Sequence, residues 1–173
     1  MSAHSRAESR SSISFDMKEK ILAVMIGIQG SGKSTFYAKF LAQDFVRVNL
    51  DTLKTRNRER LLIEECLANG TAFAVDNTNP TRADRERYIP AAKAAGYHVI
   101  GYYMESHIPT CMERNRGREG KARVPDVAIV ATARKLEMPS FDEGFDELYH
   151  VKNDGVEMTV EPWVDVKTGE RRC

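Results

Sequence analysis

The stretch G-I-Q-G-S-G-K-S at residues 27–34 follows directly on the apolar run Ile21–Ile26. It fills every fixed position of the pattern G-x-x-x-x-G-K-[ST], whose glycines let the backbone wrap closely around a polyphosphate. A chance glycine-rich turn is the alternative, but strand-like residues precede the loop and helix-forming residues follow it. The sequence therefore predicts that this protein binds a nucleoside triphosphate, through Gly27, Gln29, Gly30, Ser31, Gly32, Lys33, Ser34 and Thr35. Among these, Lys33 is expected to reach the terminal phosphates, and Ser34 is expected to ligate Mg²⁺.

Composition limits the class of protein further. The chain has 173 residues, of which 42% are hydrophobic, so one domain with a sizeable core is expected. The net charge of +1 does not by itself indicate a nucleic-acid partner. The three cysteines have no C-x-x-C spacing, which argues against a disulfide framework or a structural metal and favours a cytoplasmic protein. Every apolar run falls short of the ~20 residues that would span a bilayer, so no membrane association is expected.

Strand and helix patterns alternate along the chain. Strands are predicted at 20–26, 45–49, 72–76, 97–104 and 148–151, and helices at 33–43, 55–69, 79–95, 108–114 and 125–138. Alternation of this kind implies βαβ units and a parallel sheet with helices on both faces. The sequence therefore predicts an α/β fold, namely a three-layer sandwich built on a phosphate-binding loop.

Two acidic residues follow predicted strands, where ligands of open α/β sheets gather. Asp51 comes directly after the second strand and is the best general-base candidate, although it could instead cap the helix that follows. Asp76 ends the third strand, where it could hold Mg²⁺ through water, orient the acceptor, or make a structural bond to a neighbouring loop. Both acids are therefore expected beside the phosphates.

A basic segment at 114–123 contains five cations, one acid and two glycines. Arginines that close over a γ-phosphate stabilise its transition state and exclude water, so the segment is predicted to be a short lid. A solvated charged loop is the alternative.

Several spaced motifs together resemble those of polynucleotide 5′-hydroxyl kinases. They are the loop at 27–35, V-N-L-D-T-L at 48–53 and V-D-N-T-N-P at 75–80. N-R-G-R-E at 115–119, V-P at 124–125, M-P-S at 138–140 and E-G-F at 143–145 are similar to motifs in the kinase half of the polynucleotide kinase/phosphatases. The resemblance covers roughly residues 21–149.

The resemblance implies transfer of the ATP γ-phosphate to the 5′-hydroxyl of DNA or RNA, on an adenylate-kinase-like core. It makes Asp51 the general base and Arg118 the lid arginine, with Arg114 and Arg116 as helpers. Lys33 and Ser34 would hold phosphate and metal, and Asp76 is the family's acid at the third strand.

The acceptor side departs from the family in one position. The family often has an arginine immediately before the base, whereas this chain has Leu50. A basic residue three positions after the base binds the acceptor phosphate in some relatives, and Lys54 stands at that position. Acceptor binding could therefore differ from that of the relatives.

The chain is divided into residues 1–16 as a disordered tail, 17–152 as a P-loop kinase domain and 153–173 as a C-terminal extension that could form a hairpin around 167–169. We expect a kinase module without an accompanying phosphatase or ligase domain. Three functions are weighed: a polynucleotide kinase in nucleic-acid end repair, a kinase for a small-molecule or nucleoside hydroxyl, and a nucleotide-gated binding module. Nucleic-acid 5′-hydroxyl ends, ATP and Mg²⁺ are the partners of the first.

Overall fold

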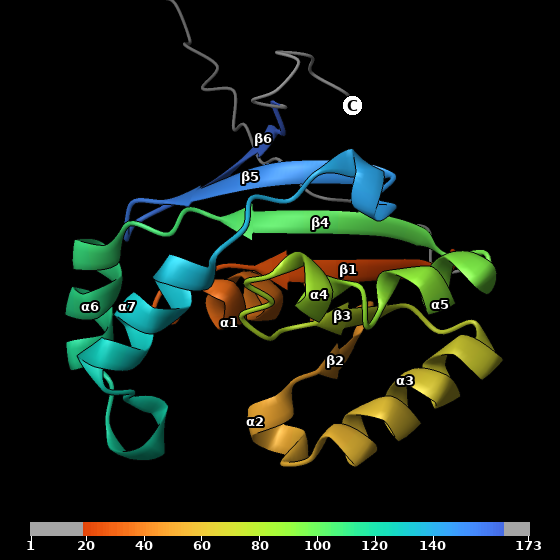
Figure 1. Ribbon diagram of the computed structural model, residues 1–173, viewed down its shortest axis with the longest axis horizontal. Coiled ribbons are helices and arrows are strands. Elements are labelled where there is room, and N and C mark those ends of the chain that lie inside the picture. The colour runs from red at the N-terminus through yellow and green to blue at the C-terminus, as the bar shows by residue number, and fades with distance from the viewer. Residues whose placement is uncertain (1–18, 165–173) are drawn as a thin grey trace, which may run out of the picture.

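One six-stranded sheet runs through the protein in the order β2-β3-β1-β4-β5-β6 (Figure 1). A computed structural model describes residues 19–164. The first five strands are parallel to their neighbours, and only β6 is antiparallel. The strands are β1 (Ile21–Ile26), β2 (Val46–Val48), β3 (Phe73–Val75), β4 (His98–Met104), β5 (Glu147–Asn153) and β6 (Met158–Pro162).

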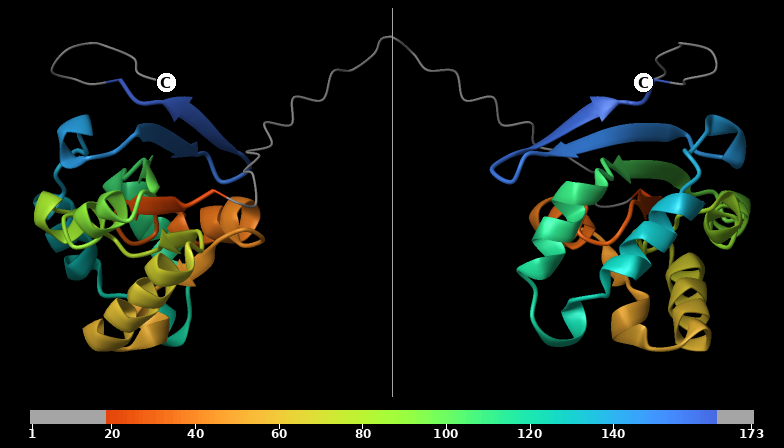
Figure 2. Two further views of the ribbon diagram at one scale, coloured as in Figure 1. Left: turned by 90° about the vertical axis from the view of Figure 1, so that its right-hand side faces the viewer. Right: turned by 60° about the vertical axis from the view of Figure 1, so that its left-hand side comes forward.

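Alternating side chains of β1 bury both faces of the sheet. Leu22, Val24 and Ile26 belong to a core shared with α3 (Arg56–Asn69) and α5 (Ile89–Ala94). Ala23 and Met25 belong to a second core on the opposite face, closed by α1 (Lys33–Phe36) and the π-helical turn η1 (Tyr37–Leu41). Helices therefore cover both faces, and the predicted three-layer α/β sandwich is confirmed (Figure 2).

A third apolar cluster lies beyond the carboxyl end of β1. It joins Ile28 of the loop to Cys111 of α6 (Ile108–Arg116) and Ile129 of α7 (Asp126–Lys135). Gly30, with φ of 82°, lies so close to α6 that an added Cβ would come within 2.4 Å of the Cys111 carbonyl oxygen. Only glycine permits this approach, so the loop is fitted directly onto α6, the helix that leads into the basic segment.

Two predicted helices are interrupted. The helix predicted at 33–43 begins as α1 but widens into η1, in which the Ala42 N–H donates to the Tyr37 carbonyl five residues earlier at 2.9 Å. The helix predicted at 79–95 consists of α4 (Arg82–Arg85) and α5. Pro90 causes this second break, because it lacks an N–H and its ring clashes with the preceding turn.

Four short elements lay outside the prediction. They are α2 (Leu50–Leu53), strand β6, the 3₁₀ turn η2 (Gly120–Ala122) within the basic segment, and the 3₁₀ turn η3 (Phe141–Glu143). The expected tail at 1–16 and the expected hairpin around 167–169 lie outside the described residues. Between residues 19 and 164, no helix combines the length and the apolar character needed to cross a membrane.

Candidate active site

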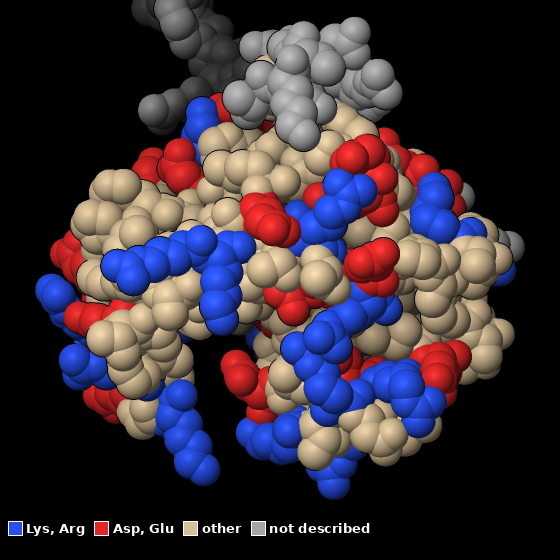
Figure 3. Space-filling view, viewed as in Figure 1, with Lys and Arg blue, Asp and Glu red and all other residues tan. Residues whose placement is uncertain are grey.

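The carboxyl ends of β1, β2 and β3 meet at a cavity of about 270 Å³. Figure 3 shows the hollow between the basic segment and the α2–α3 side, with Lys and Arg side chains on both rims. Asp51, Lys33, Ser34, Asp76 and Arg118 line it together, as the sequence predicted they would lie near one another. Its other lining residues are Gln29, Gly30, Gly32, Asn49, Leu50, Arg56, Asn77, Thr78 and Val124.

Lys33 is buried at the start of α1. Its Nζ donates to the carbonyl oxygens of Gly27 at 2.9 Å and Ile28 at 2.8 Å. Desolvation by burial lowers the pKa of Lys33 to about 8, although the nearby Asp76 carboxylate acts in the opposite direction. The ammonium is thus held in the loop, where a triphosphate would strengthen its charged form.

Other residues of the loop make hydrogen bonds to two neighbouring parts of the protein. The Gly27 N–H donates to the Thr78 carbonyl at 3.0 Å, and Ser31 is buried beneath the loop. The Gln29 amide nitrogen donates to the Thr132 hydroxyl of α7 at 3.1 Å. These contacts brace the loop against α7 and the segment that follows β3, so its backbone is preorganised to surround a polyphosphate.

A compact polar corner forms where α1, β2 and β3 meet. The Ser34 hydroxyl donates to Asp76 Oδ2 at 3.1 Å. Arg47 of β2 donates to the same oxygen from Nε at 2.9 Å and from Nη2 at 2.5 Å, and Nη2 also reaches Ser34 Oγ at 3.0 Å. Arg47 was not predicted from the sequence. The available signal was a cation between two β-branched residues of a short strand, whose side chain must share a face with the neighbouring strands.

The oxygen atoms of this corner suit Mg²⁺. Magnesium prefers a carboxylate and a hydroxyl completed by water and phosphate oxygens, and Ser34 and Asp76 supply the first two. The guanidinium of Arg47 already bridges these two side chains, which shows that the corner accommodates a positive charge. Within residues 19–164, no group of three or more His, Cys, Asp or Glu side chains is placed to hold a metal by itself.

Asp51 lies in the first turn of α2, and its side chain is exposed to the cavity. The cap of α2 is Asn49, whose side-chain oxygen accepts from the Thr52 N–H at 3.1 Å. The helix predicted at 55–69 is capped by Thr55, so Asp51 caps neither α2 nor the helix that follows, and that alternative is wrong. Lys54 ends α2 and donates from Nζ to the Asp51 carbonyl oxygen.

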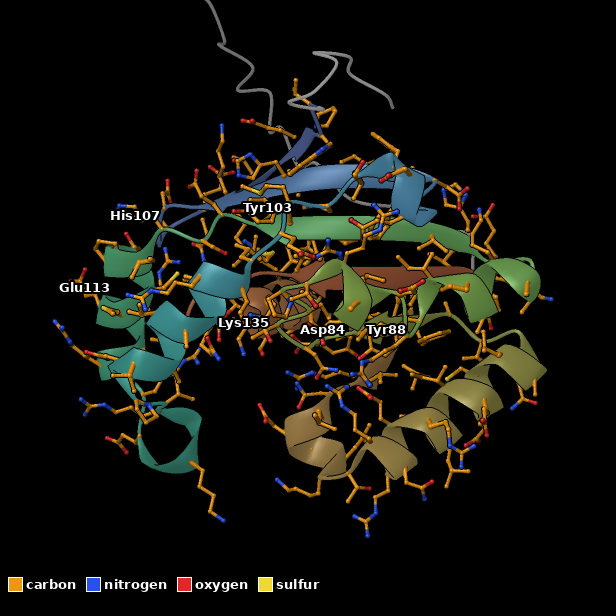
Figure 4. The ribbon with its side chains drawn as sticks, in the orientation of Figure 1. Asp84, Tyr88, Tyr103, His107, Glu113 and Lys135 are labelled. Carbon is orange, nitrogen blue, oxygen red and sulfur yellow. The ribbon has the colours of Figure 1, made fainter. Side chains whose placement is uncertain are left out.

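A hydrogen-bond network around the buried Glu59 was not predicted. Two of its members, Arg56 and Asn77, line the cavity. Glu59 of α3 is 4% exposed and accepts from Arg56 at 2.7 Å, Asn77 at 2.8 Å and Tyr88 at 3.2 Å. Figure 4 shows Tyr88 between α4 and α5, above α3. Asn77 also accepts from the Leu50 N–H at 2.9 Å, so the network reaches the helix that carries Asp51. An acid on the same face of a helix as Leu62 and Cys66 was the signal in the sequence.

The basic segment contributes its three predicted arginines unequally. Arg118 lines both this cavity and a second one of about 340 Å³. Arg114 lines the second cavity and donates to the Asn153 carbonyl oxygen at 2.7 Å. Arg116 lies 3.6 Å from Asp126, at the start of α7. The second cavity adjoins the loop on the other side and is also lined by Gly30, Gly32, Thr35, Lys39, Asn153, Gly155, Val156, Glu157 and Met158.

Several known proteins are similar to this chain over most of its length. A family model described as an AAA domain matches residues 22–139. A protein of Acanthamoeba polyphaga mimivirus, named as a putative bifunctional polynucleotide phosphatase/kinase, is 31% identical over 141 residues, which cover 78% of this chain and 34% of that protein. The bifunctional polynucleotide phosphatase/kinase of Schizosaccharomyces pombe is 28% identical over 134 residues, which cover 75% of this chain and 33% of that protein. The chain thus spans about a third of the length of these relatives.

A solved structure shares the fold. The gluconokinase of Sinorhizobium meliloti 1021 superimposes with a TM-score of 0.54 at 18% identity, covering 78% of this chain and 83% of that one. The resemblance drawn from the spaced motifs is confirmed by the two named relatives, and the fold by this structure and the family model. The chain belongs to the AAA domain family and is a P-loop kinase domain related to the polynucleotide phosphatase/kinases.

Proposed function

We propose that this protein transfers the γ-phosphate of ATP to the 5′-hydroxyl of a polynucleotide, in the repair of DNA or RNA ends. One observation carries the proposal: Asp51 shares a single cavity with Lys33, Ser34 and Arg118. This arrangement supports Asp51 as the general base for an acceptor hydroxyl, beside the groups proposed to hold phosphate. The relatives named as polynucleotide phosphatase/kinases support the choice of acceptor.

The proposed reaction is a direct in-line displacement. The Asp51 carboxylate takes the proton of the acceptor hydroxyl, whose oxygen forms a bond to the γ-phosphorus. The bond from that phosphorus to the bridging oxygen of ADP breaks, and ADP leaves with the electron pair. Lys33 and Arg118 neutralise the charge that develops on the transferred group, and no phospho-enzyme forms.

Magnesium, when bound with the triphosphate, would supply further charge neutralisation between the phosphates, and Ser34 with Asp76 would hold it. The remaining residues bind and orient. The loop around Gly30 and Gly32 separates the two cavities, so the phosphates would thread between them and the nucleoside would occupy the second cavity, beside Arg114. Arg116 stands at the rim of the lid as the further helper that the resemblance implies.

The acceptor strand is proposed to enter between the basic segment and the α2–α3 side. Arg56 lines the cavity there, and Lys54 and Arg58 are exposed nearby on the same side. Cations at such an entrance bind phosphates without reading bases, so affinity for an oligonucleotide should fall steeply as salt rises. Lys54 would reach an acceptor phosphate by giving up its contact with the Asp51 carbonyl oxygen.

A small hydroxyl compound is the second candidate acceptor. The gluconokinase structure shares the fold, and Leu50 removes the arginine that the polynucleotide kinases often carry beside the base. The cytoplasm is the proposed site of action of either kinase, because Cys66 and Cys111 are buried free thiols that suit a reducing compartment.

The deciding experiment supplies ATP labelled at the γ-phosphate, with Mg²⁺, to matched oligonucleotides bearing either a 5′-hydroxyl or a 5′-phosphate. Asp51→Asn and Lys33→Ala proteins are assayed alongside. Label on the 5′-hydroxyl strand alone, lost in both variants, is the expected result. If ATP is bound but no strand is labelled, the polynucleotide proposal fails, and a panel of sugars and nucleosides tests the second candidate.

A further inference from the structure

Arg47 occupies the polar corner that a divalent cation would need. Its guanidinium contacts Ser34 Oγ at 3.0 Å and Asp76 Oδ2 at 2.5 Å, and both of these oxygens suit magnesium. The Asp76 side chain is only 1% exposed. A buried carboxylate is unfavourable without a positive partner, and the fork of Arg47 supplies one through two hydrogen bonds.

A metal ion and this guanidinium have incompatible requirements. Both are cations, and both use the same carboxylate oxygen together with the same hydroxyl. Their charges would repel strongly at contact distance in a partly buried site. The corner can therefore be neutralised by one or by the other, but not by both in this geometry.

Arg47 has room to leave the corner. Its side chain is 37% exposed, in contrast to that of Asp76, and its guanidinium carbon lies 5.2 Å from the ring centroid of Tyr37. The Tyr37 hydroxyl is fixed by donating to the Phe45 carbonyl oxygen at 2.7 Å. The ring offers a cation–π surface on which the guanidinium can remain stacked after it releases Asp76.

We propose that Arg47 is an internal competitor for the metal: it neutralises Asp76 in the arrangement seen here and must release Asp76 and Ser34 for a divalent cation to bind with the triphosphate. The inference rests on the proposed use of a metal-bound triphosphate, but not on any particular acceptor. Arg47 is on this view a positioning residue, which sets how much divalent cation the site requires. It holds the Asp76 carboxylate in place while excluding the metal itself.

The test compares Arg47→Met, which keeps length but removes the charge, with Arg47→Lys, which keeps the charge but lacks the two-pronged fork. Arg60→Met is the matched control, because Arg60 pairs with Glu64 on the exposed face of α3. Equilibrium binding of a non-hydrolysable ATP analogue is measured over a titration of Mg²⁺, without any acceptor. Binding of Mn²⁺ alone is followed separately by electron paramagnetic resonance.

Arg47→Met is expected to lower the half-saturating Mg²⁺ concentration by about 3- to 10-fold, since apparent affinity is reduced by the fraction of protein whose site is competent. It should also strengthen Mn²⁺ binding. Arg47→Lys should shift both measurements in the same direction by less, and Arg60→Met should match the wild type. If Arg47 acted only through its positive charge at a distance, Arg47→Lys would keep the Mg²⁺ requirement and the Mn²⁺ affinity of the wild type, because that variant keeps the charge.

An unchanged or higher Mg²⁺ requirement in Arg47→Met would overturn the proposal and leave Arg47 as a purely structural partner of Asp76. If Arg47→Met does not fold, Arg47→Lys alone decides between the two roles, and an unchanged requirement there has the same meaning. Failure of the polynucleotide assignment appears elsewhere, as ATP binding without transfer to an oligonucleotide. The two failures are therefore distinguishable.

Discussion

Lys33 binds the backbone of its own loop, with Nζ 2.9 Å from the Gly27 carbonyl oxygen. This contact satisfies an ammonium that burial has deprived of water, and desolvation lowers its pKa to about 8. A triphosphate binds the charged form, so we expect affinity for an ATP analogue to weaken as pH rises through about 8, by up to ~10-fold per unit. Lys33→Arg, which stays charged, should bind with a flat profile if it binds at all. Calorimetry across this range is the measurement, and a flat wild-type profile would contradict the assignment.

The same pKa shift also links pH to folding. Above about 8 the folded protein releases the Lys33 proton, whereas the unfolded chain keeps it until pH approaches 10.5. The unfolded state therefore binds more protons in this window, and the contribution of Lys33 to stability increases as pH rises. Thermal unfolding should therefore show the stability of the wild type increasing relative to that of Lys33→Met between about pH 8 and pH 10.5.

Asp51 is predicted to act in catalysis without contributing to nucleotide binding. Asp51→Asn keeps the size of the side chain but cannot accept a full proton, so kcat should fall by ~10²–10⁴. Affinity for the ATP analogue should stay close to that of the wild type. Asp44→Asn is the control, because Asp44 is exposed in the turn between η1 and β2. A loss of activity below about tenfold would remove Asp51 as the general base.

Arg118 should stabilise the transferring phosphoryl group from the lid. It is the arginine that lines both cavities, so Arg118→Ala is expected to lower kcat by about 10²–10³, with a smaller change in the KM for ATP. The guanidinium of Arg116 faces Asp126 at 3.6 Å, and Arg116→Ala should cost less. Steady-state kinetics of the two variants separate the lid arginine from its neighbour. Equal losses of kcat in the two variants would show instead that the arginines act through their summed charge and not through one specific contact.

Stability should depend on a buried ion pair away from the cavities. Arg85 on α4 is fully buried and donates to the Glu143 carboxylate at 2.7 and 2.8 Å, as well as to the Asn79, Pro80 and Glu137 carbonyl oxygens at 3.1–3.2 Å. Glu143→Ala leaves this guanidinium uncompensated and should destabilise folding by about 3–5 kcal/mol. Denaturant unfolding gives the value.

The neighbouring acid provides the comparison for this pair. Asp142 pairs with Arg82 on the surface at 3.0 Å, with both side chains more than half exposed. Solvent screens such a pair, so Asp142→Ala should leave the unfolding midpoint almost unchanged. Similar losses in Asp142→Ala and Glu143→Ala would indicate that the 3₁₀ turn η3, and not the ion pair, is what both substitutions damage.

The elements predicted correctly are those whose signals are local. The loop at 27–34 follows a fully buried strand, and Asp76 directly follows a three-residue buried strand, so position along the chain was enough to place both at the same edge of the sheet. The start of α4 is also determined locally, because Thr81 and Asp84 form a capping box in which both hydrogen bonds are present.

The features that escaped prediction depend on partners distant in sequence. In the sequence, Arg47 is a single cation that could equally be exposed. In the structure, β2 lies beside β3, Arg47 pairs in register with Ala74, and its guanidinium reaches Asp76. Glu59 reads as an ordinary helix charge until Asn77 and Tyr88 meet it from two other segments. Strand β6 (Met158–Pro162) lacks a run of apolar residues and ends at a proline, and pairing with β5 gives it its structure. In each case contacts between segments distant in sequence supply the information that the local pattern lacks.

The β5–β6 hairpin, near the C-terminal end of the described residues, packs against the phosphate-binding loop at 27–34. The Asn153 side chain lies where a Cβ on Gly32 would come within 2.6 Å, and the Asn153 carbonyl holds Arg114 at 2.7 Å. A shortened protein ending at residue 152 would retain all the sequence motifs at 27–145, yet it would lack residues that line the second cavity and the carbonyl that accepts from Arg114 of α6. A domain boundary drawn from the motifs alone would thus remove part of the second cavity. A fragment that is to keep this cavity has to include β6.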